Sequence, residues 1–412
     1  MSIILYDLFL LLYNFGIRLV SPWNRKARLW IRGRQRFPSG TFREKTIWMH
    51  CASLGEFEQG RPLLEDIKKK YPSYKIVLSF FSPSGYEIRK NYPGADLVFY
   101  LPMDNKTNAR KLIDTLNPSL VLWVKYEFWY YYLTELKQRK IPVLLVSGIF
   151  RSTQPFFKWY GRIWKDMLEC FSYLFIQNHE SIKLLSSIGK KDHVEIAGDT
   201  RFDRVITIAE KKEPVAYIEG FINGHPVLIA GSTWEEDQIE LFHFVKTRPD
   251  IKFIIAPHEV SDKNLYDVKK EFAGSIFYSS LSEAYMAEAA HVLIINNVGM
   301  LAKLYQYATV SFVGGGFGDD GVHNVLEAAV FGRPVVFGPV YEKYEEASGL
   351  VESGGGHSVR NLLELEALLN KLFDENRSPS ESGAAAKAFV YGHRGATKKI
   401  LDHIERNRLL IN

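Results

Sequence analysis

The chain has 412 residues, enough for two domains of ordinary size, and its 46% hydrophobic and 24% charged residues are typical of a folded globular protein. Its two cysteines are too few for a disulfide framework and lie in no metal-ligand spacing, so we expect a reducing compartment and no metal. Residues 1–45 hold nine Lys or Arg against two acidic residues, which leaves a net charge of −2 for residues 46–412. A basic body built for nucleic acid is therefore not supported.

The first predicted element is an apolar run, Ile3–Val20, which Asp7, Asn14 and Arg18 interrupt. The run is about as long as a minimal transmembrane helix, but its polar residues also allow a helix that lies in the membrane interface. The basic cluster follows the apolar run, whereas in a cleaved signal peptide it comes first. We expect residues 1–24 to form a membrane anchor; the alternative is a buried N-terminal helix of a soluble domain.

The basic segment 25–36 follows this run directly. It is predicted to stay on the cytoplasmic side and to bind anionic lipids. Trp23 and Trp30 suit the level of the lipid headgroups.

From residue 45 onward, apolar runs alternate with helical stretches, which predicts parallel α/β construction. The strands predicted in the first half are Thr46–His50, Lys75–Phe80, Leu97–Tyr100, Leu120–Val124, Val143–Ser147 and Leu174–Gln177, with helices such as Glu58–Tyr71 and Thr107–Leu116 between them. The strands predicted in the second half are Pro226–Ala230, Lys252–Ala256, Gly274–Tyr278, Val292–Ile295, Val310–Val313 and Pro334–Gly338.

A polar stretch, 210–219, separates the two halves and is predicted to be a linker. We therefore predict two doubly wound, Rossmann-like domains, residues 40–209 and 220–395, that face each other across a cleft, followed by a C-terminal helix at 396–412. Ligands of such sheets bind at the carboxyl ends of the strands. The Ser/Gly/Ala-rich segment Ser378–Ala386 is predicted to be a loop.

A glycine-rich turn follows the predicted strand Val310–Val313. It contains Gly314–Gly316, Gly318 and Gly321, and it leads into a predicted helix, Asn324–Phe331. Glycines let a backbone approach a ligand closely, and a helix N-terminus offers N–H groups to anions. The pattern predicts a phosphate site, with Glu327 placed to reach an attached ribose; the alternative is an ordinary glycine-rich turn.

Charged and hydroxyl residues follow several predicted strands. Glu56 is a candidate general base for a hydroxyl group, or else a first-turn residue that complements the helix dipole. Glu127 is a second candidate acid, or an exposed loop residue, and Arg201 is a cation for a phosphate or carboxylate, or half of a surface salt bridge. Ser232 and Thr233 suit a phosphate, although helix capping explains them as well.

In this order, the segments resemble the Kdo transferases, which move 3-deoxy-D-manno-octulosonic acid (Kdo) from CMP-Kdo to the lipid A precursor. Ser53-Leu54-Gly55-Glu56 is similar to the family's S-[VL]-G-E element, and Glu127-Phe128-Trp129 to its E-x-W element. Gly198–Asp203 is similar to its G-x-x-K/R-F-D element, and His323–Glu327 to its H-N-x-L-E element. The resemblance covers roughly residues 40–400.

The resemblance implies a GT-B glycosyltransferase, with the acceptor on the N-terminal half and the donor on the C-terminal half. Glu56 is similar to the proton acceptor of the family, and Glu127 and Arg201 match positions that stabilise the transition state. The residues matched to nucleotide binding are Pro257, His258, Gly299, Met300, Leu301, Asn324, Val325, Leu326 and Glu327.

The chain departs from the family pattern at three places. Arg201 stands where lysine is common, the loop around Pro257 lacks an arginine, and Met300 stands where glutamate is common. Arg201 keeps the positive charge, but arginine and lysine differ in geometry and hydration. Asn324 and Glu327 match the family pattern better than Pro257, His258 or Met300.

The function implied is an inverting transfer without metal or cofactor. It would take place on the cytoplasmic face of the inner membrane of a Gram-negative bacterium. The partners implied are CMP-Kdo, the lipid A precursor (lipid IVA) and anionic membrane lipids, with no nucleic acid. Two alternatives stay open: another membrane-associated GT-B glycosyltransferase that uses a UDP-sugar, and a non-catalytic sugar- or nucleotide-binding protein. The sequence leaves open how many Kdo units are added and whether the N-terminal helix spans the membrane.

Overall fold

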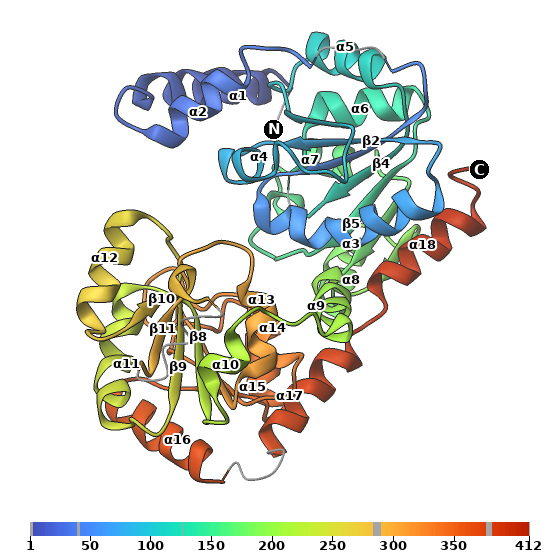
Figure 1. The fold of residues 1–412 in the computed structure, drawn as a ribbon. Helices are drawn as coiled ribbons and strands as arrows, with labels where there is room; N and C mark the ends of the chain where they lie inside the picture. The colour runs from blue at the N-terminus through green and yellow to red at the C-terminus, as the bar shows by residue number, and fades with distance from the viewer. Residues whose placement is uncertain (1–2, 39–41, 126, 283–289, 376–380, 412) are drawn as a thin grey trace. The chain divides into compact units, whose positions relative to one another are not determined.

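The structure is a computed structural model that describes residues 3–38, 42–125, 127–282, 290–375 and 381–411. The chain divides into two compact units, residues 1–203 together with 395–412, and residues 204–394. Each unit contains a seven-stranded sheet whose strands are all parallel, with helices packed against it (Figure 1). The prediction of two doubly wound α/β domains is thereby confirmed.

The sheet of the first unit has the strand order β3-β2-β1-β4-β5-β6-β7. Its strands are β1 Thr46–Cys51, β2 Lys75–Phe80, β3 Leu97–Tyr100, β4 Pro118–Val124, β5 Val143–Gly148, β6 Tyr173–Ile176 and β7 Val194–Ile196. Its helices are α1 Ile3–Val20, α2 Arg25–Gly33, α3 Leu54–Lys70, α4 Pro83–Arg89, α5 Lys106–Leu116, α6 Tyr130–Gln138, η1 Pro155–Phe157, α7 Arg162–Leu168, α8 His179–Ser187 and α18 Ala396–Arg406. The direction of strand order reverses at β1 and β4, which is where ligands bind in sheets of this kind.

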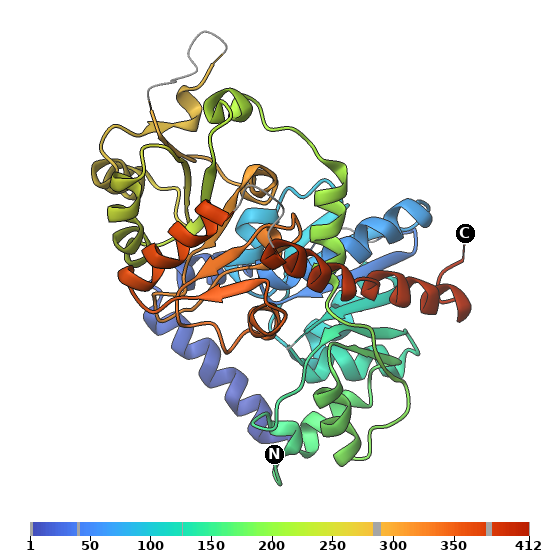
Figure 2. The same ribbon diagram turned by 90° about the horizontal axis from the view of Figure 1, so that it is seen from below.

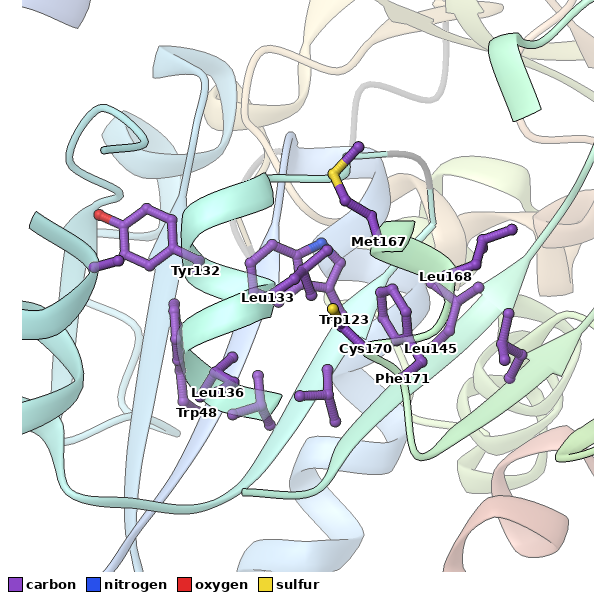
Figure 3. Packing of buried hydrophobic residues seen from close by; sticks show 14 of the residues in the cluster. Trp48, Trp123, Tyr132, Leu133, Leu136, Leu145, Met167, Leu168, Cys170 and Phe171 are labelled. Carbon is purple, nitrogen blue, oxygen red and sulfur yellow. The ribbon is translucent and has the colours of Figure 1, made fainter. Parts of the chain in front are cut away.

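The strands of this sheet are apolar throughout because both of their faces are buried. Trp48 on β1 and Trp123 on β4 pack with Tyr132 on one face, with ring centroids 5.7 and 6.0 Å from Trp48 (Figure 3). Met49 and Leu122 point to the other face. Helix α18 completes that second layer, because its buried Ala396, Ile400 and Ile404 recur every four residues along one helix face. About 190 residues of the chain separate it from the rest of the unit.

The sheet of the second unit has the strand order β10-β11-β9-β8-β12-β13-β14. Its strands are β8 Val227–Thr233, β9 Lys252–Pro257, β10 Ile276–Phe277, β11 Val292–Ile294, β12 Val310–Val313, β13 Val335–Phe337 and β14 Gly356–Ser358. Its helices are α10 Ile218–Ile222, α11 Glu235–Thr247, α12 Asp262–Glu271, η2 Tyr278–Ser280, α13 Leu301–Leu304, η3 Tyr305–Tyr307, α14 Leu326–Ala329, α15 Glu345–Glu352, α16 Leu362–Glu375 and α17 Glu381–Gly392. Helix α9, Thr200–Lys211, contains the division between the two units.

Two predicted irregular segments are partly helical. The first two residues of the predicted linker 210–219 end α9 and its last two begin α10, because buried Val205, Ile206 and Ala209 give α9 an apolar face that continues its helical period. Within the predicted loop Ser378–Ala386, residues 378–380 lie outside the described residues, and residues 381–386 belong to α17. Alanine is the strongest helix former, and these small residues let α17 approach Gly355 closely.

Candidate functional site

Glu127 lies just beyond the carboxyl end of β4, where its carboxylate has two ring partners. Its Oε2 accepts a hydrogen bond from Trp129 Nε1 at 3.2 Å and lies 3.1 Å from His50 Nε2 at the end of β1. Trp123 Nε1 donates to the main-chain carbonyl of Glu127. The Glu127 side chain is 20% exposed, whereas His50 is fully buried, so the carboxylate is held from the protein side and keeps one side towards solvent.

The hydrogen-bond partners of His50 indicate which of its ring nitrogens carries a proton. Trp48 Nε1 donates to Ser79 Oγ at 2.8 Å, and Ser79 Oγ lies 2.9 Å from His50 Nδ1. An ionised carboxylate can only accept, so His50 Nε2 carries a proton; in the neutral ring Nδ1 then accepts from the hydroxyl of Ser79, which accepts from the indole of Trp48. His50 then carries its proton on Nε2 and donates it to Glu127. A chain of three buried donors therefore orients the carboxylate. The sequence analysis had named His50 only as the last residue of a predicted strand.

Glu56 lies in the first turn of α3, after the N-cap residue Ser53, and is 7% exposed. Its Oε2 accepts a short hydrogen bond from the backbone N–H of Ala52. This contact is the one that the structural alternative of the sequence analysis expects, a first-turn acid at a helix N-terminus. Burial, and then the charges of Glu56 and Glu127, raise the pKa of the Cys51 thiol well above its usual range, so both carboxylates lie near the end of β1.

Arg201, in the first turn of α9, forms a two-pronged ion pair with Asp199. Its Nε and Nη2 lie 2.8 and 2.7 Å from Asp199 Oδ2, and its backbone N–H donates to Oδ1 at 2.9 Å. Burial alone would raise the pKa of Asp199, but the charge and hydrogen bonds of Arg201, assisted by Lys125, outweigh it and lower that pKa. The pair is mostly buried, with side chains 21% and 6% exposed, so it is not a surface salt bridge.

The three candidate catalytic residues lie at one edge of the first sheet. Gln59, three residues after Glu56 on α3, donates to Asp199 Oδ2 at 3.0 Å and so connects the helix of Glu56 with the partner of Arg201. Lys125, two residues before Glu127, is close enough to lower the pKa of Asp199. Two acids and a cation at the carboxyl ends of parallel strands can take up a proton and stabilise negative charge there.

Three rings stack at the carboxyl ends of β8 and β9 in the second unit. The Trp234 and His258 rings lie 4.5 Å apart, the His258 and His323 rings 4.4 Å apart, and Trp234 Nε1 donates to His323 Nε2 at 2.9 Å. Burial, and then the neighbouring His258, lower the pKa of His323 to about 4. His323 is therefore neutral at pH 7, with its proton on Nδ1, and the stack offers aromatic faces rather than positive charge.

Asp237 organises the glycine-rich turn that the sequence analysis predicted to hold a phosphate. Its Oδ2 accepts from the backbone N–H groups of Trp234 and Gly315, each at 2.8 Å. The N–H of Gly314 donates to Gly231 O at 2.9 Å, and a Cβ on Gly314 would lie 2.5 Å from Ser232 O. At these two positions, the glycines serve close packing of the chain on itself and their N–H groups already have partners, as in the alternative interpretation of an ordinary turn.

The helix predicted at Asn324–Phe331 is shorter than expected, since α14 covers only Leu326–Ala329. Asn324 precedes it, and its Oδ1 accepts from the N–H of Leu326 at 3.2 Å. Its Nδ2 donates to Glu327 Oε1 at 3.1 Å. Burial raises the pKa of Glu327, against the opposing charge of Arg204. Asn324 and Glu327 therefore form a linked polar pair.

The other residues matched to nucleotide binding differ in their access to solvent. Pro257 ends β9 and is buried, as are Val325 and Leu326, so these three support the neighbouring residues rather than offer side chains. Gly299 is exposed with φ +96°, a conformation that glycine adopts without strain, and it precedes Met300 and Leu301 at the start of α13.

Comparison with known proteins gives the following relatives. The family model described as 3-Deoxy-D-manno-octulosonic-acid transferase (kdotransferase) matches residues 28–204. The 3-deoxy-D-manno-octulosonic acid transferase of Aquifex aeolicus is 26% identical over 333 residues, which cover 79% of this chain and 85% of that protein. A bifunctional glycosyltransferase/methyltransferase of Fusobacterium nucleatum is 26% identical over 352 residues, or 82% of this chain, and the chain spans 54% of that protein.

Among solved structures, the UDP-GlcNAc 2-epimerase from Neisseria meningitidis matches with a TM-score of 0.61 over 88% of this chain and 100% of that chain. At 16% sequence identity this likeness shows the fold alone. Together with the two parallel sheets, it confirms the GT-B fold class.

Proposed function

We propose that this chain, which belongs to the Kdo transferase family, transfers Kdo from CMP-Kdo to a lipid A precursor. The observation that carries the proposal is the sequence relationship to Kdo transferases, which extends over about four-fifths of the chain and includes both units. Membership of this family makes the chain a glycosyltransferase; the donor, the acceptor and the residue roles below are the proposed part.

In the proposed reaction, the carboxylate of Glu56 takes the proton of the acceptor hydroxyl as its oxygen attacks C2 of Kdo. The bond between C2 and the phosphate oxygen breaks, CMP leaves with the bonding electrons, and the configuration at C2 inverts. The position of Glu56 beside β1, at the carboxyl edge where sheets of this type bind ligands, supports this role.

Glu127 and Arg201 are proposed to orient the acceptor and to stabilise charge that develops during transfer. Preorganisation of such groups is what makes them effective, because no energy is then spent on reorienting them during the reaction. The hydrogen bonds of His50 and Trp129 to Glu127 and the buried ion pair of Arg201 with Asp199 support this role.

CMP-Kdo is proposed to bind the second unit. The residues proposed to hold it are His258, Gly299, Met300, Leu301, Asn324 and Glu327, with the buried Pro257, Val325 and Leu326 supporting them. The neutral ring stack suits the flat face of a pyrimidine, and the Asn324–Glu327 pair suits the hydroxyls of a ribose. We place the reaction at the cytoplasmic face of the bacterial inner membrane, where α1 and the anionic lipids would meet.

The test separates the two contributions of Glu56. Glu56→Gln keeps an oxygen that can accept from Ala52 N–H but cannot take a proton, whereas Glu56→Ala loses both. Both variants are expected to bind CMP, and both are expected to lose about 100-fold or more of turnover. Glu56→Gln alone is expected to keep wild-type stability. Asp66→Asn, a half-exposed acid on the same helix, serves as the control.

Turnover is measured as the gain in mass when a tetraacylated lipid A precursor is mixed with fresh CMP-Kdo. Wild-type turnover by Glu56→Gln would remove Glu56 from the mechanism. No product from the wild-type protein, together with tighter binding of UDP than of CMP, would instead favour a transferase that uses a UDP-sugar.

A further inference from the structure

One side of α1 is fastened to the first unit by polar contacts. Tyr6 Oη donates to Asp104 Oδ2 at 2.6 Å and accepts from the backbone N–H of Tyr130 at 3.2 Å. Tyr131 Oη lies 2.8 and 2.9 Å from the two carboxylate oxygens of Asp7. The polar residues of the first half of α1 are therefore satisfied by the body of the protein, and Tyr6 is buried there.

The second half of α1 packs over the ends of other strands. The Tyr13 ring lies 6.1 Å from Trp30 and 6.2 Å from Phe81, the residue that follows β2. Arg34, just after α2, donates to the carbonyls of Phe81 and Leu101, which follow β2 and β3. Tyr6 meets the start of α6 after β4, so α1 runs along the carboxyl edge of the sheet. In Figure 2 its N-terminal end meets the green segment that contains α6 and α7.

The outward side of α1 is apolar and open to solvent. Its exposed residues are Ile3, Ile4, Leu5, Leu8, Phe9, Leu11, Leu12, Phe15, Leu19 and Val20. Only 11% of the helix is buried, and Trp23 in the following turn is 81% exposed. The exposed basic residues beside it are Arg18, Arg25, Lys26, Arg28, Arg32 and Arg36. Trp30, predicted at the headgroup level, is instead buried between Arg34 and Phe81.

A second exposed aromatic residue comes from another loop of the same edge. Trp159, in the segment that follows β5, is 96% exposed, with Lys158 and exposed Arg162 close by in the chain. Phe156 holds this segment in place, because its ring lies 4.9 Å from the ring of Phe128. Phe128 directly follows Glu127 in the chain. Tryptophan flanked by basic residues is the pattern of a membrane–water interface.

We propose that the carboxyl edge of the first sheet is the face that this protein lays on an anionic lipid bilayer, with α1 lying in the plane of the interface rather than across the membrane. The apolar face of α1, Trp23 and Trp159 enter the acyl region, and the basic residues of α2 bind lipid phosphates. The charge and the apolar surface together identify the occupant as anionic lipid rather than as another protein.

A spanning helix does not fit the contacts of Tyr6 and Asp7. The hydrocarbon core is about 30 Å thick, so a helix of 18 residues would have to lie in it along its whole length. It would then leave behind Asp104, which is buried and also accepts from the N–H groups of Tyr131 and Tyr132. It would also carry the carboxylate of Asp7 into lipid without Tyr131.

The inference rests on the membrane attachment included in the proposed function, and it specifies which face of the first unit makes that attachment. Glu127 lies between β4 and α6. Burial, and then the charge of Glu127, raise the pKa of Tyr13, so this carboxylate lies near α1. An acceptor with lipid tails would therefore meet the candidate catalytic edge at the bilayer surface without leaving the membrane.

Spin labels test the depth of each segment. The full chain carries a nitroxide at Leu12→Cys, Trp159→Cys or, as the control at the amino edge before β2, Ser73→Cys; both native cysteines are buried. Vesicles contain phosphatidylglycerol and phosphatidylcholine. Collision with oxygen should exceed collision with a nickel chelate at positions 12 and 159, at a depth of about 5–10 Å, and the reverse should hold at position 73. Removal of phosphatidylglycerol should weaken binding about tenfold or more.

Several results would overturn the proposal. Position 12 at the bilayer centre, with position 159 as wet as position 73, would mean a spanning helix. All three positions in water would mean no lipid face, and undiminished binding without phosphatidylglycerol would remove the anionic specificity.

Tyr6→Phe should speed hydrogen exchange at the Tyr130 amide in vesicles, whereas the exposed control Tyr266→Phe should not. Kdo transfer to an acceptor in detergent is assayed on the same samples, so failure of the chemistry is distinguished from failure of the seating.

Discussion

The buried histidine behind Glu127 offers a matched pair of substitutions. His50→Asn places an amide near the Nδ1 position and keeps the contact with Ser79, whereas His50→Gln reaches the Nε2 position and keeps the contact with Glu127. Both variants lose the packing of the ring against Trp123, 4.5 Å away, so both should lose a similar stability of about 1–3 kcal/mol. Only His50→Asn leaves the carboxylate without its buried donor.

The expected difference follows from the energy of that hydrogen bond. A hydrogen bond to a charged group contributes about 1.5–3 kcal/mol, and roughly 1.4 kcal/mol corresponds to a tenfold change in rate. His50→Asn should therefore turn over roughly 10- to 100-fold more slowly than His50→Gln in a transfer assay with saturating CMP-Kdo, at equal thermal stability. Equal rates for the two variants, or a slower His50→Gln, would show that the contact between His50 and Glu127 has no part in transfer.

Three further results are expected. The pKa of His323 is lowered from 6.5 to about 4, so between these pH values the unfolded chain binds a proton at this residue that the folded unit does not. Stability measured by urea unfolding should therefore be lower at pH 5 than at pH 7, and His323→Gln should reduce this loss. An unchanged pH dependence in His323→Gln would contradict the lowered pKa. Ile400→Ala should destabilise the first unit by about 2–5 kcal/mol, measured by denaturant unfolding, whereas the exposed Lys398→Ala should stay near wild type. Gly314→Ala should lower the melting temperature of the second unit, because the added Cβ would lie 2.5 Å from Ser232 O. Gly318→Ala should not, because the Cβ there would lie 3.7 Å from the nearest atom. Equal melting temperatures for the two variants would refute the packing role of Gly314.

Most strands could be predicted because strands buried on both faces are continuous apolar runs. The two that were missed, β7 and β14, have three residues each, Val-Glu-Ile and Gly-His-Ser, and carry no such run. Helix α18 was recognised as a helix, but nothing in its pattern says which unit it covers. That depends on a surface built by residues far earlier in the chain.

In the candidate site, too, some residues could be predicted from the sequence and others could not. Glu127 could be chosen from its place after a strand, but His50 and Ser79 looked like polar interruptions of two apolar runs. They become a pair only in the register of β1 with β2, which sets His50 opposite Ser79. Polar residues in the middle of buried strands were the available signal, since such residues need partners. The phosphate site predicted at the glycine-rich turn stays a prediction, because local sequence cannot tell a glycine that faces a ligand from one that, like Gly314, faces its own chain.

The contacts of α1 and the candidate catalytic carboxylate share one short segment of this chain. Asp104 accepts from the N–H groups of Tyr131 and Tyr132 and from Tyr6 of α1, so one carboxylate holds both the start of α6 and α1. Glu127 lies three residues before that helix and accepts a hydrogen bond from Trp129, the residue directly before α6. A change that frees α1 should therefore also loosen the candidate catalytic carboxylate. This coupling gives a physical reason for Tyr6 and Asp7 in the mostly apolar helix α1, where leucine would be expected if the helix only had to bind lipid.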